Sequence, residues 1–201
     1  MTDEGYIKFH CQWIEAPPVQ SHLFTELNRW RQRLYRAGLI GYCPDLRVSY
    51  GNLSARAPSA REFIVTGTQT GNIPTLSGAH YTLVTDYEID ANSVTCRGPI
   101  QASSETLTHA AIYELDEAFR AVVHVHNKPL WRRLRYVVPT TRDHVSYGTP
   151  DMAGEFRRLY VESDLEKRRI AVMGGHEAGL ISLGESVAEA AQRLLDHEEQ
   201  N

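Results

Sequence analysis

The run Ala121–His126 constrains the fold of this chain more than any other segment. Its sequence, Ala-Val-Val-His-Val-His, is apolar and strand-like except for two histidines. In a strand the side chains at positions i and i+2 point to the same face, so the imidazoles of His124 and His126 converge. Two neutral imidazoles form half of a metal site, and a third ligand would complete a catalytic one. The alternative is a pair of hydrogen-bonded structural histidines, and the spacing alone favours neither.

The remaining periodicity predicts helices mixed with short strands. Apolar residues recur at the helical period in residues 21–37, 104–119 and 185–199, and Gly38 is typical of a helix end. Short strands are expected at 47–50, 63–65, 81–84, 94–96, 170–173 and 180–183, with turns at Gly51-Asn52 and Thr66-Gly67. This mixture predicts an α/β or α+β layered domain, and 201 residues suit a single one.

Charge and hydropathy exclude several classes of partner. The net charge of −4 and the pI of about 6.1 argue against a dedicated nucleic-acid binder. The basic runs 132–135 and 167–169 are interpreted as solvated surface because acidic residues lie close by. Mean hydropathy is −0.39, no apolar run approaches the roughly 18 residues of a membrane span, and the N-terminus lacks a secretion-signal pattern. We therefore expect a cytoplasmic protein without nucleic-acid or membrane partners.

The three cysteines, Cys11, Cys43 and Cys96, predict no disulfide framework. Their number is odd, their spacings are long, and no CxxC pair occurs. We expect reduced, partly buried thiols.

A third imidazole comes from the glycine-rich segment that begins Gly174-Gly175-His176. The glycines let the backbone bend His176 towards a distant partner, although a lone turn histidine more commonly faces solvent. Together with the His124 and His126 pair, it makes a metal site the better interpretation. His109 is an alternative ligand, ranked below His176.

Glu105 follows Ser103-Ser104 at the start of an expected helix. A carboxylate there is either a simple helix cap or a general base held beside a metal. Nearby hydroxyl and amide groups are suited to phosphate or carboxylate oxygens, although hydroxyl-rich turns are common. These groups are Asn52, Thr66, Gly67, Ser103 and Ser104.

Four motifs, in the order in which they occur along the chain, resemble those of the class II aldolase/adducin family. They are Gly51-Asn52-Leu53-Ser54, Ser103-Ser104-Glu105, Val123-His124-Val125-His126 and His176-Glu177-Ala178-Gly179-Leu180, with Gly184-Glu185 before the last helix. The similarity runs from about residue 21 to the C-terminus. It implies a three-layer α/β/α fold with a largely antiparallel central sheet. It also implies one domain over 1–201, with 1–20 as an N-terminal extension, and a homotetramer with active sites between subunits.

The resemblance assigns roles by position. His124, His126 and His176 would bind Zn²⁺ or another divalent ion such as Mn²⁺ or Co²⁺, and Glu105 would be the acid/base. Asn52, Ser103 and Ser104, with Thr66 and Gly67, would hold a substrate phosphate. The related pentulose-phosphate 4-epimerases have aspartate in place of this glutamate, so Glu105 favours the aldolase branch. The family's second proton donor is a tyrosine, for which Tyr136 and Tyr147 are nearby candidates.

The predicted function is a metal-dependent lyase that cleaves the aldol C–C bond of a small ketose or ketose phosphate through an enediolate. One alternative is a related metal-dependent epimerase or dehydratase. Another is a non-catalytic, adducin-like assembly module.

Overall fold

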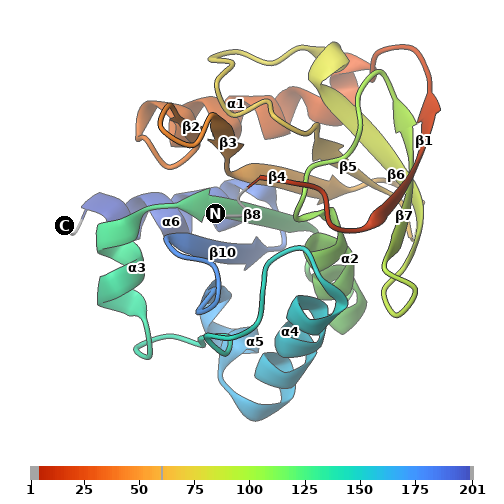
Figure 1. Ribbon diagram of the computed structural model, residues 1–201. Coiled ribbons are helices and arrows are strands. Elements are labelled where there is room, and N and C mark those ends of the chain that lie inside the picture. Colours follow the sequence, from red (N-terminus) through yellow and green to blue (C-terminus); the bar gives the residue numbers. More distant parts are fainter. Residues whose placement is uncertain (1–4, 60, 200–201) are drawn as a thin grey trace.

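The computed structural model describes residues 5–59 and 61–199, and these residues form one large sheet flanked by helices (Figure 1). Its eight strands follow the spatial order β1 (His10–Glu15), β7 (Ser93–Gly98), β6 (Tyr81–Glu88), β5 (Phe63–Thr66), β4 (Asn52–Arg56), β8 (Ala121–His126), β10 (Gly179–Gly184) and β9 (Ile170–Val172). Only the β1–β7 pair is parallel among these described strands. A separate hairpin joins β2 (Gly41–Cys43) to β3 (Val48–Tyr50).

Helices cover both faces of this sheet. One face packs against α1 (Ser21–Arg36), α3 (Lys128–Leu134) and α6 (Val187–Glu199), and the other against α2 (Thr106–Leu115) and α4 (Pro150–Glu162). Figure 1 shows α1 and the α2–α4 pair on opposite sides of β4 and β8. The short helices η1 (Gly78–His80) and α5 (Leu165–Arg168) precede β6 and β9. The predicted three-layer α/β/α fold with a largely antiparallel sheet is confirmed.

Strand β8 divides its side chains between two apolar cores. Ala121, Val123 and Val125 pack in the core beneath α1 and α6, whereas Val122 packs in the core beneath α2 and α4. Alternation along the strand therefore places His124 and His126 on the α2 side. The periodicity of the first predicted helix is also confirmed, because Leu27, Trp30 and Leu34 are buried along α1.

Two predicted boundaries were wrong for local reasons. The helix expected over 104–119 is α2, and it ends at Leu115 because the Asp116 side chain accepts a hydrogen bond from the Ala118 amide and competes with the helix. Asn52 begins β4 instead of completing a turn, and Gly51 alone, with φ of +80°, supplies the turn.

The segment expected as an N-terminal extension contributes a strand to the sheet. β1 pairs with β7 along its full length, while residues 1–4 lie outside the described part of the chain. The sulfur of Cys11 on β1 lies 3.8 Å from the sulfur of Cys96 on β7, and both are free thiols, as is Cys43. Cys96 is fully buried, and the other two are partly buried, close to the expectation.

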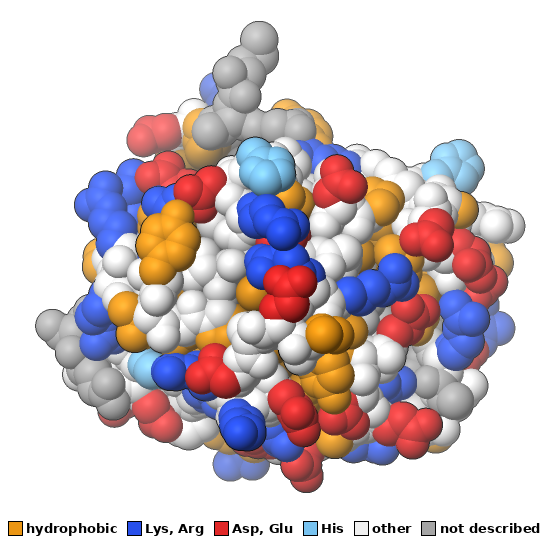
Figure 2. Space-filling model, turned by 90° about the horizontal axis from the view of Figure 1, so that it is seen from below, with side chains coloured by type: hydrophobic (Ala, Val, Ile, Leu, Met, Phe, Trp, Pro, Cys, Tyr) orange, Lys and Arg blue, Asp and Glu red, His pale blue; other side chains and the backbone are white. Residues whose placement is uncertain are grey.

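Charged side chains of both signs are interspersed over the face shown in Figure 2. The two basic runs follow the same pattern, because Arg135 pairs with Asp143, Arg168 with Asp164 and Arg169 with Glu185. This arrangement supports the interpretation of both runs as solvated surface. Among the described residues, no helix combines the length and apolar character needed to cross a bilayer.

A buried arginine on α1 fixes the loop that follows β5. Arg31 is 1 % exposed, and its guanidinium donates hydrogen bonds to the carbonyl oxygens of Thr70 and Ile73 at 2.9 and 2.5 Å. It also reaches the carbonyls of Gly71 and Pro74. Burial lowers the pKa of Arg31, and these carbonyls replace the water that its charge has lost.

We predict that Arg31→Met lowers the free energy of unfolding by about 2–4 kcal/mol, because it leaves several carbonyls without a charged donor. Arg31→Lys should lower the free energy of unfolding by less, since its ammonium can still donate to some of the carbonyls that the guanidinium binds. Denaturant unfolding measures both. Arg29→Met, on the exposed side of α1, is the control, and equal stability of the Arg29 and Arg31 variants would contradict the prediction.

Candidate metal centre and active site

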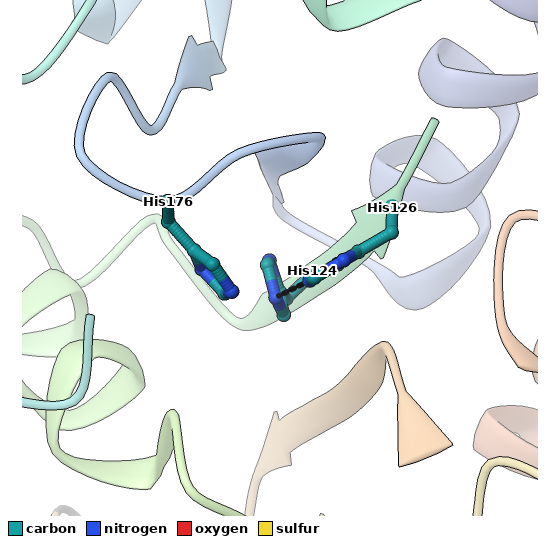
Figure 3. Close-up of side chains that lie close together, drawn as sticks. All are labelled: His124, His126 and His176. Atoms are coloured by element: carbon teal, nitrogen blue, oxygen red, sulfur yellow. Dashed lines mark hydrogen bonds between the residues drawn. The ribbon is translucent and has the colours of Figure 1, made fainter. Parts of the chain in front are cut away.

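Neighbouring strands position two of the three histidines. His124 pairs with Asn52 of β4 and Ile181 of β10, and His126 pairs with Gly179 of β10. Figure 3 shows both rings projecting from β8 towards His176, which comes from the loop before β10. Ligand atoms of the three imidazoles all lie within 4.8 Å of one another. The structure therefore brings the predicted ligand trio together.

The hydrogen bonds of His124 define which of its nitrogens can bind a metal. Its Nδ1 lies 3.1 Å from the carbonyl oxygen of Leu180, which can only accept, so Nδ1 carries the proton. Its Nε2 therefore has a lone pair, and it lies 3.1 Å from Nε2 of His126 (Figure 3). This separation is close to the roughly 3.3 Å expected between two nitrogens on a tetrahedral Zn²⁺.

The electrostatic environment keeps His124 neutral. Burial holds its pKa well below the ordinary value, and the neighbouring His126 and His176 rings lower it further. Neutral imidazole is the form that binds a metal ion, so this pocket favours the ligand form.

Close backbone packing holds the loop that carries His176. A β-carbon on Gly174 would lie 2.1 Å from the Thr141 carbonyl oxygen, and one on Gly175 would lie 2.0 Å from that of Val145. The two glycines are therefore required for close approach of this loop to residues 141–145. His176 is 4 % exposed, so it is not a solvent-facing turn residue.

Two tyrosines stack on the histidine rings. Tyr147 stacks on His176 with a centroid distance of 4.5 Å, and Tyr50 stacks on His126 at 5.4 Å. Tyr147 thus borders the centre, whereas Tyr136 is 72 % exposed and donates its hydroxyl hydrogen bond to Asp143. Of the two candidate proton donors, only Tyr147 lies against the histidines in this chain.

Glu105 occupies the N-cap position of α2, but its side chain makes no capping hydrogen bond. One carboxylate oxygen accepts a 2.7 Å hydrogen bond from the Thr108 hydroxyl, and the other lies 3.4 Å from Nδ1 of His176. The carboxylate is 1 % exposed. The structure therefore directs this acid towards the histidines, and the capping alternative does not describe it.

The predicted anion-binding residues gather at neighbouring positions. A β-bridge between Gly67 and Ala102 brings the end of β5 to the residues before α2, and the register of β4 places Asn52 beside His124. Ser103 is buried, and the Asn52 side-chain oxygen has no hydrogen-bond partner among the described residues. A buried polar atom of this kind ordinarily has a partner, such as water or a ligand.

Thr66 and Gly67 also support the fold. The Thr66 hydroxyl accepts a hydrogen bond from the Leu53 amide at 3.3 Å, and the Gly67 amide donates to the carbonyl of His80 at 2.8 Å. The Gly67 amide already donates to the His80 carbonyl, so it is not available to donate to an anion.

Sequence and structural comparisons identify the family and the fold. Residues 33–200 match the profile of the Class II Aldolase and Adducin N-terminal domain family. The chain belongs to this family. No curated protein matches the sequence.

Solved structures show the same fold. An L-fuculose 1-phosphate aldolase has a TM-score of 0.66 at 17 % identity, covering 91 % of this chain and 86 % of that one. YgbL of Escherichia coli, a proposed aldolase, epimerase or decarboxylase, has a TM-score of 0.65 at 21 % identity, covering 89 % and 86 %. A sugar-phosphate aldolase from Thermotoga maritima has a TM-score of 0.64 at 16 % identity, covering 89 % and 91 %. At these identities, the likeness establishes the fold of this family member.

His109, considered as an alternative ligand, belongs to a separate buried network. Its Nδ1 lies 2.8 Å from the Ser54 hydroxyl, which in turn lies 2.7 Å from the Tyr113 hydroxyl. His109 is not in the histidine group of the centre. Burial lowers its pKa to about 3, so it is neutral at ordinary pH.

Sequence reasoning missed Tyr50 as a neighbour of the centre, although it directly precedes the Gly51-Asn52 pair. Ser54 lies on the same face of β4 as Asn52, but its contacts are with His109 and Tyr113. No sequence signal predicted that Tyr50 stacks on His126.

We predict that the metal-free protein loses stability as the pH falls from about 6.5 towards 3. The folded-state pKa values of His109 and His124 lie below the unfolded value, so protons bind preferentially to the unfolded chain in this window. The contribution of these two histidines to the free energy of unfolding is fully present above about pH 6.5. His109 alone contributes about 2.5 kcal/mol to the loss between pH 7 and 4.5.

Urea unfolding at the two pH values tests this prediction. His109→Asn keeps a polar atom near Ser54 and should reduce the loss, whereas the exposed control His22→Asn should not. An identical loss in the wild type and the His109 variant would contradict it.

Proposed function

We propose that this protein is a divalent-metal-dependent, aldolase-type lyase that cleaves the aldol C–C bond of a small ketose or ketose phosphate. The observation that carries the proposal is the convergence of three imidazoles within 4.8 Å, with the Glu105 carboxylate 3.4 Å from His176. Membership of the class II aldolase and adducin family supports the same chemistry.

The donor set fits a divalent cation. His124, His126 and His176 would hold Zn²⁺, Mn²⁺ or Co²⁺, since His124 already has its proton on the nitrogen that faces Leu180. Three protein ligands leave positions for substrate oxygens. When bound, the cation supplies a Lewis acid that lowers the cost of the negative charge formed as the C–C bond breaks.

Glu105 would move the proton at the nucleophilic carbon. Its carboxylate is buried, and the Thr108 hydroxyl fixes one of its oxygens, so the other oxygen keeps a defined direction. A positioned general base of this kind contributes roughly 10²–10⁴-fold to the rate.

The opposite end of the substrate would lie against Asn52, Ser103 and Ser104, with Thr66 and Gly67 behind them. The buried Ser103 hydroxyl can donate to an anionic group, and the unpartnered Asn52 oxygen can accept a hydrogen bond from a substrate hydroxyl. Because all three histidines and Glu105 are present, catalysis is favoured over an assembly role. Product analysis separates a lyase from an epimerase or dehydratase. The homotetramer implied by the resemblance and the cytoplasmic location expected from hydropathy and the N-terminal pattern stay predictions.

We predict that His126→Ala abolishes tight metal binding, because two ligands cannot replace a three-imidazole site. Native mass spectrometry of protein loaded with one equivalent of Zn²⁺ measures the bound ion. His144→Ala, outside the histidine group, is the control and should keep its ion. Retention of one stoichiometric ion by the His126 variant would refute the ligand assignment.

We predict that Glu105→Gln keeps the metal but lowers retro-aldol turnover by about 10²–10⁴-fold, because the amide cannot accept the proton. Metal analysis and a retro-aldol assay across a panel of ketoses and ketose phosphates measure the two effects. Full turnover with metal bound would remove Glu105 from the mechanism, and cleavage of none of the panel by the wild type would oppose the proposed reaction.

A further inference from the structure

The segment 141–147 supports His176 in two ways. It holds the loop that carries this histidine, because the Gly174 amide donates a 2.8 Å hydrogen bond to the hydroxyl of Thr141, a residue that is 1 % exposed. The glycine between Gly174 and His176 also packs on the segment, without room for a β-carbon. Tyr147, at the end of the segment, stacks on the His176 ring with a centroid distance of 4.5 Å. The position of this ring therefore depends on the segment.

A buried carboxylate on α4 holds this segment in place. Glu155 is 3 % exposed, and its Oε2 accepts a 2.7 Å hydrogen bond from the main-chain amide of Arg142. The Arg142 carbonyl in turn accepts a hydrogen bond from the Val145 amide at 3.2 Å. Glu155 therefore joins α4 to the backbone of the segment that supports His176.

Two guanidinium groups orient the Glu155 carboxylate. Its Oε1 accepts hydrogen bonds from Nη1 of Arg142 at 2.7 Å and from Nε of Arg158 at 2.9 Å, and its Oε2 accepts one from Nη2 of Arg158 at 2.8 Å. The hydrogen bonds from Arg158 lower the pKa of Glu155, so the acid is ionised at neutral pH. With charged donors on both oxygens, the carboxylate has little freedom to rotate, and its bond to the Arg142 amide keeps a fixed direction.

The ion pairs alone do not require Glu155 to be buried. Arginine also pairs with an exposed carboxylate on the same helix, since Arg158 contacts Glu162, whose side chain is 60 % exposed. Burying a carboxylate costs hydration free energy that an ion pair often fails to offset. The contact that the buried position adds is the hydrogen bond to the main-chain amide of Arg142.

We propose that Glu155 is a positioning residue that holds residues 141–147 against His176 and its loop through the hydrogen bond to the main-chain amide of Arg142. This inference rests on the proposed function, under which His176 is a metal ligand. It gives a residue of α4, outside the histidine group of the centre, a part in metal binding.

The competing explanation is that Glu155 only stabilises α4 by pairing with Arg142 and Arg158. The two roles respond to different substitutions. A positioning role depends on the main-chain bond and tolerates loss of the Arg142 side chain, because any residue other than proline at this position keeps the amide. An ion-pair role predicts similar effects of Arg142→Met and Glu155→Ala, and a general loss of stability predicts similar effects of any equally destabilised variant.

The test compares wild type with Glu155→Ala, Glu155→Gln, Arg142→Met and the control Leu165→Ala. Leu165 of α5 is buried in the core beneath α2 and α4, so its truncation destabilises this side of the molecule but removes none of the Glu155 hydrogen bonds. Glu155 borders a cavity of about 420 Å³, so water can reach the arginines in the alanine variant. Urea unfolding of the metal-free proteins first establishes which variants are folded and how stable each one is.

Competition with a chromophoric chelator measures the Zn²⁺ affinity. We expect Glu155→Ala to weaken Zn²⁺ binding by about ten-fold, the lower end of the range for residues that support metal ligands. Glu155→Gln should lose less affinity, since its amide oxygen can still accept from the main-chain amide, and Arg142→Met should bind as wild type does. Wild-type affinity in the folded Glu155 variants, or an equal loss in Arg142→Met or Leu165→Ala, would overturn the proposal.

A second measurement separates this inference from the proposed function. Hydrogen exchange of the metal-free proteins, followed by NMR, reports on the amides of Gly174 and His176, which donate to Thr141 and Met173 and not to Glu155. Faster exchange of both amides in Glu155→Ala than in wild type and Leu165→Ala supports the positioning role even if the protein takes up no zinc, in which case only the proposed function fails. Unchanged exchange, together with normal zinc uptake by wild type, overturns the role of Glu155 alone.

Discussion

The hydrogen bond between Nδ1 of His124 and the Leu180 carbonyl is the interaction on which the centre depends. It comes from the antiparallel pairing of β8 with β10 and settles the tautomer of a ring that burial already keeps neutral. The apolar residues that alternate with the histidines anchor β8 between two cores. The fold and the ligand chemistry therefore have a common origin in one strand.

Other parts of the site lie on loops that pack near this strand, and specific contacts hold those loops in place. Gly174 and Gly175 allow the His176 loop to pack closely against residues 141–145. Arg31 donates hydrogen bonds to carbonyl oxygens of the loop after β5. Tyr50 and Tyr147 then cover two of the imidazoles. Because loops have little intrinsic preference for one conformation, these contacts supply the rigidity that a preorganised site needs.

Local patterns in the sequence predicted those parts of the fold that local physics determines. The 3.6-residue period identified α1, and the i, i+2 rule placed His124 and His126 on one face. Helix α4 and strand β1 were not predicted, since β1 is an edge strand with mostly exposed residues whose pairing depends on distant β7. The spacing of Glu105 allowed two roles, and only tertiary structure showed that its carboxylate turns from the helix end towards His176. His109 shows the same limit, because its partner Ser54 lies on β4, far from His109 in the sequence.

Two hydrogen bonds just before β1, from the Gln69 side chain to the Gly5 carbonyl and from the Tyr6 amide to the Tyr147 hydroxyl, have a practical consequence for handling the protein. A purification tag fused before Gly5 is attached close to these two hydrogen bonds, and it can disturb the position of Tyr147 against His176. A tag placed after α6 avoids this interference, and comparing the two fusions is a simple precaution before any assay of turnover or affinity.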